Sequence, residues 1–188
     1  MIVAFVGNQG SGKTLGLTFN AWFSFRYMYH LVNGFWQIKP DWKIYANYKL
    51  KGIDFEPITN IDEIDKMRSG TFFGDEFWSW ADSRESETPL NKIISKIILA
   101  ARKRNVNIFY TTQKLHQMEK RIRDITDMIV VPRLYGWKII RNEPIPLKCE
   151  LNWYDSSLNE MKDFRQRFYT LKIFDMYDTT EEISSIEK

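Results

Sequence analysis

Short apolar runs alternate with longer segments of helical spacing along this chain of 188 residues. The short runs are rich in β-branched and aromatic residues, which favours strands. The longer segments repeat apolar residues every three or four positions or carry the boundary signals of helices. The expected strands are residues 2–6, 43–48, 71–74, 106–112 and 128–133. The expected helices are residues 13–32, 61–68 and 89–103, with a turn or short helix at 114–122.

Boundary residues support these helices. Asn33-Gly34 is expected to end the first one. Asn60 is expected to cap the second, with Glu63 three residues later as in a capping box. Pro89 is expected to open the third, in which isoleucines recur at helical spacing.

This alternation of strands and helices predicts an α/β fold, a three-layer sandwich around a mainly parallel sheet. Three later segments with strand character, residues 137–141, 146–154 and 168–174, are expected to add an antiparallel edge. We expect one domain over residues 1–188. Within it, we expect residues 1–133 to form the core, 134–178 the added edge strands and 179–188 a polar tail.

A phosphate-binding loop stands between the first strand and the first helix. The pattern G-x-x-x-x-G-K-[ST] is complete in Gly7-Asn-Gln-Gly-Ser-Gly-Lys-Thr14. Its glycines allow the backbone N–H groups to converge on phosphate, its lysine reaches the β- and γ-phosphates, and its threonine offers a hydroxyl to Mg²⁺. The sequence therefore predicts a site for ATP and Mg²⁺. The residues assigned to it are Gly7, Asn8, Gln9, Gly10, Ser11, Gly12, Lys13 and Thr14.

Two carboxylates follow the expected strand at 71–74, and they are typical of a Walker B motif. Ligands of a parallel sheet bind at the carboxyl ends of its strands, so these side chains belong at the same edge as the phosphate loop. We assign Asp75 to Mg²⁺ and Glu76 to the general base that polarises the attacking water. A small-molecule kinase, which needs no such base, would leave Glu76 without a role.

A polar residue also follows the strand at 106–112. Gln113 could sense the γ-phosphate or orient the attacking water. The alternative is a glutamine in a loop that contacts no ligand.

The composition indicates the cellular compartment of the protein. The single cysteine, Cys149, excludes an internal disulfide and fits a reducing compartment. No stretch reaches 18 consecutive apolar residues, and the first apolar run is too short for a signal peptide. We therefore expect a cytoplasmic protein without a membrane span.

Charge is unevenly distributed, although the net charge is only +3. Residues 54–87 hold ten acidic and three basic residues, whereas residues 92–133 hold ten basic and three acidic. Three interpretations remain open: a surface that faces DNA, two faces that meet between neighbouring subunits, or solvated helix surfaces.

Beyond these motifs, Ala101-Arg-Lys-Arg-Asn-Val-Asn-Ile-Phe-Tyr-Thr-Thr-Gln113 resembles the arginine-containing, strand-then-glutamine segment of the FtsK–HerA superfamily of DNA-pumping ATPases. Residues 114–130 also resemble the zonula-occludens-toxin-like branch and the small genome-packaging ATPases of membrane-containing viruses. The resemblance covers residues 1–133. It implies an additional-strand, catalytic-glutamate (ASCE, RecA-like) P-loop ATPase that works as a ring, commonly a hexamer, on double-stranded DNA.

The resemblance also implies an arginine that acts on ATP bound by a neighbouring subunit. Arg102 matches the position of the arginine ahead of the glutamine strand, and Arg104, Arg121 and Arg123 are weaker candidates. Such an arginine neutralises charge on the transferring phosphoryl group. The alternative is that these cations are solvated and stabilise a helix end.

Together these observations predict an ATP hydrolase that translocates double-stranded DNA and packages a viral genome into a preformed capsid. A capsid or portal vertex protein is a further candidate partner, which would dock the motor on the capsid. Toxin-like assembly proteins usually carry a membrane span after the ATPase domain, and this sequence shows none. The main alternative is nevertheless an assembly or extrusion ATPase of that type, acting at a membrane complex.

Overall fold

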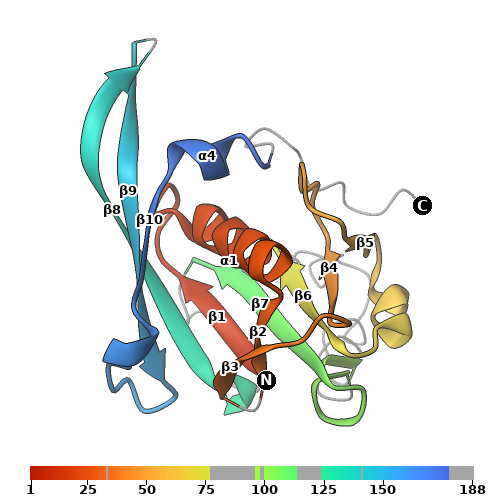
Figure 1. Ribbon diagram of the computed structural model, residues 1–188. Helices are drawn as coiled ribbons and strands as arrows, with labels where there is room; N and C mark the ends of the chain where they lie inside the picture. The colour runs from red at the N-terminus through yellow and green to blue at the C-terminus, as the bar shows by residue number, and fades with distance from the viewer. Residues whose placement is uncertain (33, 77–95, 98–99, 114–123, 141, 178–188) are drawn as a thin grey trace, which may run out of the picture.

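A mainly parallel sheet forms the centre of the protein. The computed structural model describes residues 1–32, 34–76, 96–97, 100–113, 124–140 and 142–177. Within them, eight strands form one sheet in the order β10-β9-β8-β1-β7-β6-β4-β5, and β2 pairs with β3 separately (Figure 1). The strands are β1 (Ile2–Val6), β2 (Tyr29–Val32), β3 (Phe35–Ile38), β4 (Lys43–Ala46), β5 (Glu56–Pro57), β6 (Gly70–Gly74), β7 (Val106–Thr112), β8 (Met128–Ile140), β9 (Glu143–Asp155) and β10 (Gln166–Tyr169).

The strand order places the phosphate loop beside the acidic residues. From β8 to β5 every pairing in the eight-stranded sheet is parallel, whereas β9 and β10 are antiparallel. Strand β7 lies between β1, which precedes the phosphate loop, and β6, which precedes Asp75. The prediction of a mainly parallel sheet with an antiparallel edge is therefore confirmed.

Buried side chains pack on both faces of the sheet, which gives three layers. Helix α1 (Lys13–Tyr27) covers one face, where Phe5, Leu15 and Leu17 belong to one apolar cluster. On the other face Ile64 of the 3₁₀ helix η1 (Ile61–Lys66) and Ile97 belong to a second cluster. Residues 96, 97 and 100–103 are helical, in agreement with the expected third helix as far as it is described.

The chain after β9 returns to the α1 side. The short helices η4 (Lys162–Phe164) and α4 (Leu171–Phe174) flank β10, and α4 lies beside α1 (Figure 1). The prediction of one strand over residues 168–174 is therefore wrong, because the strand ends at Tyr169 and a helix follows. Leu171 to Phe174 form a helical turn there, which buries Ile173 in the core cluster that includes α1 residues.

The first helix is shorter than expected. It ends at Tyr27, and Met28 takes a left-handed backbone with φ of 53°. Residues 29–32 then pair with β3 as an antiparallel hairpin. Gly34, with φ of 86°, belongs to the hairpin connection instead of a helix end. Asn-Gly between two runs rich in aromatic and β-branched residues is the stronger hairpin signal, and it overrides the helical spacing.

The second expected helix forms as 3₁₀ helix η1. Asn60 caps it as predicted, because its Oδ1 accepts the N–H groups of Asp62 and Glu63 at 3.0 and 3.3 Å. The Glu63 carboxylate accepts from the Thr59 N–H at 2.7 Å, one residue before the position expected in a capping box.

The expected strands at 128–133 and 137–141 belong to one long strand, β8, as far as Ile140. With β9 it forms a hairpin that runs on beyond the other strands (Figure 1). The element expected at 114–122 and residues 77–95, which include Pro89 and the start of the helix expected at 89–103, lie outside the described residues. So do Arg121, Arg123 and the polar tail.

Candidate nucleotide-binding site

The phosphate loop is a tight backbone turn between β1 and α1. Gly10 and Gly12 have φ of 74° and 91°, which residues with a Cβ atom rarely adopt. A Cβ atom on Gly7 would lie 2.3 Å from Ser11 Oγ, so the curl of the loop leaves no space for a side chain there. The loop is tied to the sheet because the Gly7 N–H donates to the Thr112 carbonyl at 3.3 Å.

Lys13 lies inside this loop. Its side chain is 7% exposed, and its Nζ donates to the Asn8 carbonyl at 3.0 Å. Burial lowers the pKa of the ammonium, and the carboxylates of Glu76 and Asp75 oppose that shift. The loop therefore holds the Lys13 ammonium against its own backbone, which is where a phosphate-binding lysine has to lie.

Thr14 and Asp75 bring two oxygen ligand types together. Thr14 Oγ1 lies 3.0 and 2.9 Å from the two carboxylate oxygens of Asp75. Burial raises the pKa of Asp75, while hydrogen bonds from Thr111 and Thr14 pull it back down. A buried carboxylate beside a hydroxyl has the donor chemistry that Mg²⁺ prefers, so these residues fit the ion.

Two residues that the sequence analysis missed hold Asp75 in place. Asn47 Oδ1 accepts the Asp75 N–H at 2.7 Å, and Asn47 Nδ2 donates to the Asp75 carbonyl at 2.8 Å. Thr111 Oγ1 donates to Asp75 Oδ1 at 2.7 Å and accepts the Glu76 N–H at 2.9 Å. The available signal was that both are polar residues at the carboxyl ends of strands β4 and β7, on either side of β6.

Glu76 and Gln113 lie at the same edge of the sheet. Glu76 directly follows Asp75, is exposed, and has a left-handed backbone with φ of 44°. Gln113 directly follows β7, the strand between the phosphate loop and the acids, and is also exposed. Both side chains are thus accessible from the edge where the phosphate loop lies.

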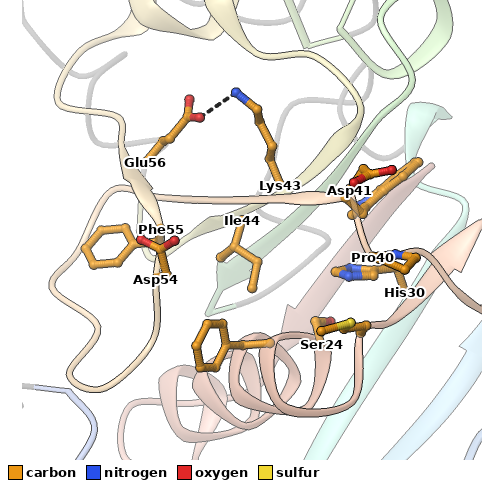
Figure 2. A pocket seen from close by; sticks show the side chains of 12 residues that line it. Ser24, His30, Pro40, Asp41, Lys43, Ile44, Asp54, Phe55 and Glu56 are labelled. Carbon is orange, nitrogen blue, oxygen red and sulfur yellow. Dashed lines mark hydrogen bonds and ion pairs between the residues drawn. The ribbon is translucent and has the colours of Figure 1, made fainter.

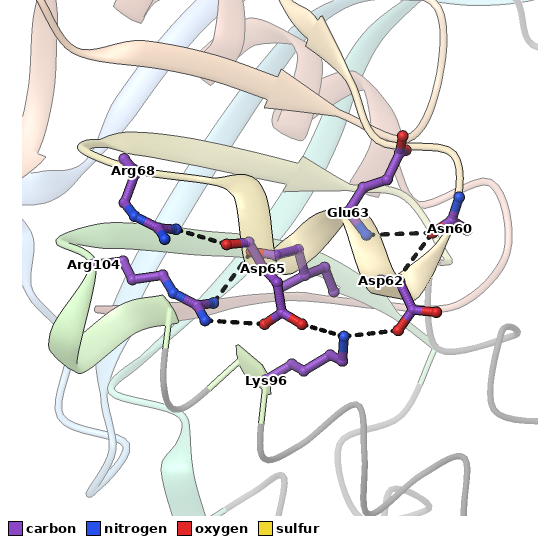
Figure 3. Close-up of polar contacts among 8 residues, drawn as sticks. Asn60, Asp62, Glu63, Asp65, Arg68, Lys96 and Arg104 are labelled. Carbon is purple, nitrogen blue, oxygen red and sulfur yellow. Dashed lines mark hydrogen bonds and ion pairs between the residues drawn. The ribbon is translucent and has the colours of Figure 1, made fainter.

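The two described arginine candidates differ in their surroundings. Arg104 Nη2 pairs with Asp65 at 3.0 Å, and Lys96 bridges Asp65 and Asp62 in the same network (Figure 3). Arg104 is therefore engaged by an acidic residue of its own chain. Arg102, in contrast, is exposed.

A separate hollow of about 290 Å³ lies near the other end of α1 (Figure 2). Ser24, one of its lining residues, is about 16 Å along the helix from Lys13. The described residues around it include His30, Lys43, Phe55 and Glu56, but none of the residues assigned to nucleotide. In the described residues, moreover, no helix combines the length and apolar character needed to cross a bilayer.

Comparison by sequence finds no matching family model and no matching curated protein. Comparison by structure finds the N-terminal domain of zonular occludens toxin from Neisseria meningitidis, with a TM-score of 0.53 and 16% identity over 94% of this chain and 98% of that one. The genome packaging NTPase B204 of Sulfolobus turreted icosahedral virus 2, in complex with ATP-gammaS, has a TM-score of 0.50 and 13% identity over 85% and 94%.

The chain has the fold of a P-loop NTPase. A third similar structure is B204, the DNA-packaging ATPase of Sulfolobus turreted icosahedral virus, with a TM-score of 0.50 and 11% identity over 88% of this chain and 95% of that one. Both branches that the sequence resembles therefore recur among structures of the same fold. At these identities, the likeness establishes the fold.

Proposed function

We propose that this protein hydrolyses ATP at the carboxyl edge of the sheet. The phosphate loop binds the triphosphate, with Lys13 at the β- and γ-phosphates. Glu76 is the general base that takes a proton from the attacking water, and Gln113 senses the γ-phosphate. Arg102 completes the site of a neighbouring subunit.

Thr14 and Asp75 would hold Mg²⁺. When bound, the ion neutralises charge on the phosphate oxygens and orients them for attack. The protein's own contribution is to keep a hydroxyl and a carboxylate within 3.0 Å of one another at the start of α1.

One observation carries this proposal: the pairing of Thr14 with Asp75. The phosphate loop follows β1 and the acid follows β6, and β7 lies between these two strands. A chance glycine-rich turn would have no reason to meet a carboxylate that is followed directly by a second acid. The cluster is therefore best explained as a site for a metal-bound triphosphate that undergoes hydrolysis.

We further propose that hydrolysis drives double-stranded DNA into a viral capsid. Support comes from the resemblance of residues 101–130 to DNA-pumping ATPases and from the fold shared with a DNA-packaging ATPase. In this proposal the motor is a ring of identical subunits. It grips duplex DNA through phosphate contacts and docks on a capsid or portal vertex protein.

Phosphate release with and without long duplex DNA tests the proposal, run beside size-exclusion chromatography in the presence of ATP. We expect duplex DNA to raise turnover and ATP to favour an oligomer. Lys13→Ala is the matched control and should lose turnover in both conditions. A rate of phosphate release that neither duplex nor single-stranded DNA changes would contradict the motor function.

The second candidate is an assembly or extrusion ATPase that moves protein or single-stranded DNA through a membrane complex. The fold shared with the zonular occludens toxin domain over 94% of this chain favours it. Stimulation by single strands but not by duplex DNA, or capture of a membrane partner, would identify this function instead.

A further inference from the structure

Strands β4 and β7 flank β6. A polar side chain at the carboxyl end of each of these two strands contacts the turn that follows β6. Asn47, just beyond β4, pairs with both the N–H and the carbonyl of Asp75. Thr111, near the end of β7, contacts Asp75 and Glu76 together. The acidic turn is therefore held from both sides by the sheet itself.

The Thr111 hydroxyl has a defined orientation. A hydroxyl carries one proton, and here that proton points to Asp75 Oδ1 at 2.7 Å. Its lone pair accepts the Glu76 N–H at 2.9 Å. Thr111 is 1% exposed, so little water is available to replace either bond. One buried group thus fixes a carboxylate oxygen of Asp75 relative to the backbone of Glu76.

Glu76 needs such support because of its backbone. Its φ of 44° lies in the left-handed region, which residues other than glycine seldom adopt without local hydrogen bonds. The direction of the Glu76 side chain follows from this φ. A Glu76 amide without its acceptor would let the turn relax toward a more common conformation and would redirect the carboxylate.

We propose that Thr111 is a positioning residue for hydrolysis, and that it holds the Glu76 base in a fixed relation to Asp75. This inference rests on the proposed ATP hydrolysis. Asn47 supports the same turn from the opposite strand, through the backbone of Asp75. Thr111 also lies two residues before Gln113, so the γ-phosphate sensor and the base are anchored by the same strand end.

The test compares Thr111→Val, which removes the hydroxyl and keeps the shape, with Thr111→Ser, which keeps the hydroxyl. Thr71→Val is the matched control, because Thr71 is a buried threonine near the opposite end of β6 whose hydroxyl accepts a hydrogen bond from Trp42 Nε1 at 2.9 Å. We expect Thr111→Val to lower kcat by about 10- to 100-fold with KM within about twofold of the wild type, since small misplacements of a reacting group cost this much. Thr111→Ser should restore most of kcat, and Thr71→Val should leave kcat unchanged.

Amide hydrogen exchange at Glu76 provides a readout that does not depend on turnover. The amide should exchange slowly in the wild type and in Thr111→Ser, and at least tenfold faster in Thr111→Val. A wild type that turns over ATP, with Thr111→Val equal to it in kcat, would overturn the positioning role and leave the proposed function standing. A wild type without any turnover would overturn the proposed function, and with it the role of Thr111. Unchanged exchange at Glu76 in Thr111→Val would overturn the structural basis of the inference.

Discussion

Thr14 Oγ1 lies within hydrogen-bonding distance of both carboxylate oxygens of Asp75. The two residues are 61 positions apart in the sequence, yet the parallel sheet brings the loop after β1 and the turn after β6 to one edge. This contact joins the phosphate loop to the acidic turn. It is also the place where a divalent cation would be expected to bind.

The first prediction concerns that ion. Thr14→Val removes one oxygen ligand, so the Mg²⁺ concentration for half-maximal turnover should rise by about 10- to 100-fold, a range typical of lost groups around metal sites. Thr14→Ser keeps the hydroxyl and should need Mg²⁺ as the wild type does. Phosphate release measured across a Mg²⁺ titration checks this. An unchanged Mg²⁺ requirement in Thr14→Val would remove Thr14 from the ligand set.

The second prediction concerns sharing of sites between subunits. Arg102→Ala should lower the turnover rate by about 10³- to 10⁵-fold, which is the effect of an arginine supplied in trans in known cases. Mixing Arg102→Ala with Glu76→Gln should recover activity, because some sites then combine an intact base with a neighbour's arginine. Arg104→Ala is the comparison variant: Arg104 pairs with Asp65 in its own chain, so mixing should not rescue it. No recovery at any mixing ratio of Arg102→Ala with Glu76→Gln would argue against shared sites.

The third prediction concerns the packing of α1 on the sheet. A Cβ atom on Gly16 would lie 2.8 Å from Leu151 Cδ2 and 3.4 Å from Phe5 Cδ1. Gly16→Val should therefore lower the free energy of unfolding by about 1–3 kcal/mol, as overpacked cores do. Leu151→Ala should cost less in the Gly16→Val background than in the wild type, because it removes the clashing atoms. Denaturant unfolding of the four proteins measures this coupling, and strict additivity would contradict it.

The fourth prediction concerns pH. His30 is 2% exposed, and burial lowers the pKa of its imidazole from 6.5 to about 4. The unfolded chain takes up a proton below pH 6.5 that the folded chain resists until about pH 4. The contribution of neutral His30 to the free energy of unfolding is thus complete above pH 6.5. It declines as the pH falls toward 4, by at most about 3 kcal/mol in total.

A non-titrating replacement isolates this effect. The free energy of unfolding of His30→Phe should fall less between pH 7.5 and pH 5 than that of the wild type. Urea unfolding at both pH values provides the comparison. Equal pH dependence in the two proteins would show that His30 is not the group responsible.

Local patterns predicted much of the fold, and the failures have physical causes. Strands β1 and β7 were predicted with their observed bounds, because a buried parallel strand is rich in β-branched and aromatic residues. Residues 29–32 were assigned to the first helix because the aromatic residues of that segment continue as far as Tyr29. The decisive interaction was pairing with β3, which helical periodicity does not report.

In the candidate site, too, local sequence motifs were predictable, whereas contacts that depend on the order of the strands were not. The phosphate loop and the Asp75-Glu76 pair could be identified because each is a contiguous motif. Asn47 and Thr111 could not, because they stand 28 and 36 positions from Asp75 and reach it only through the order of strands β4, β6 and β7. A single polar side chain at the end of a strand has no distinguishing pattern until its neighbours in the sheet are known.

ATP binding and ATP turnover, measured together in Glu76→Gln, test the central claim most directly. Removing the carboxylate base while keeping the size of the side chain should leave ATP affinity within a few-fold of the wild type and reduce hydrolysis by about 10²-fold or more, the range of general base catalysis. Full turnover in Glu76→Gln with Mg²⁺ and duplex DNA present would contradict the assignment of the acidic turn as the hydrolytic centre.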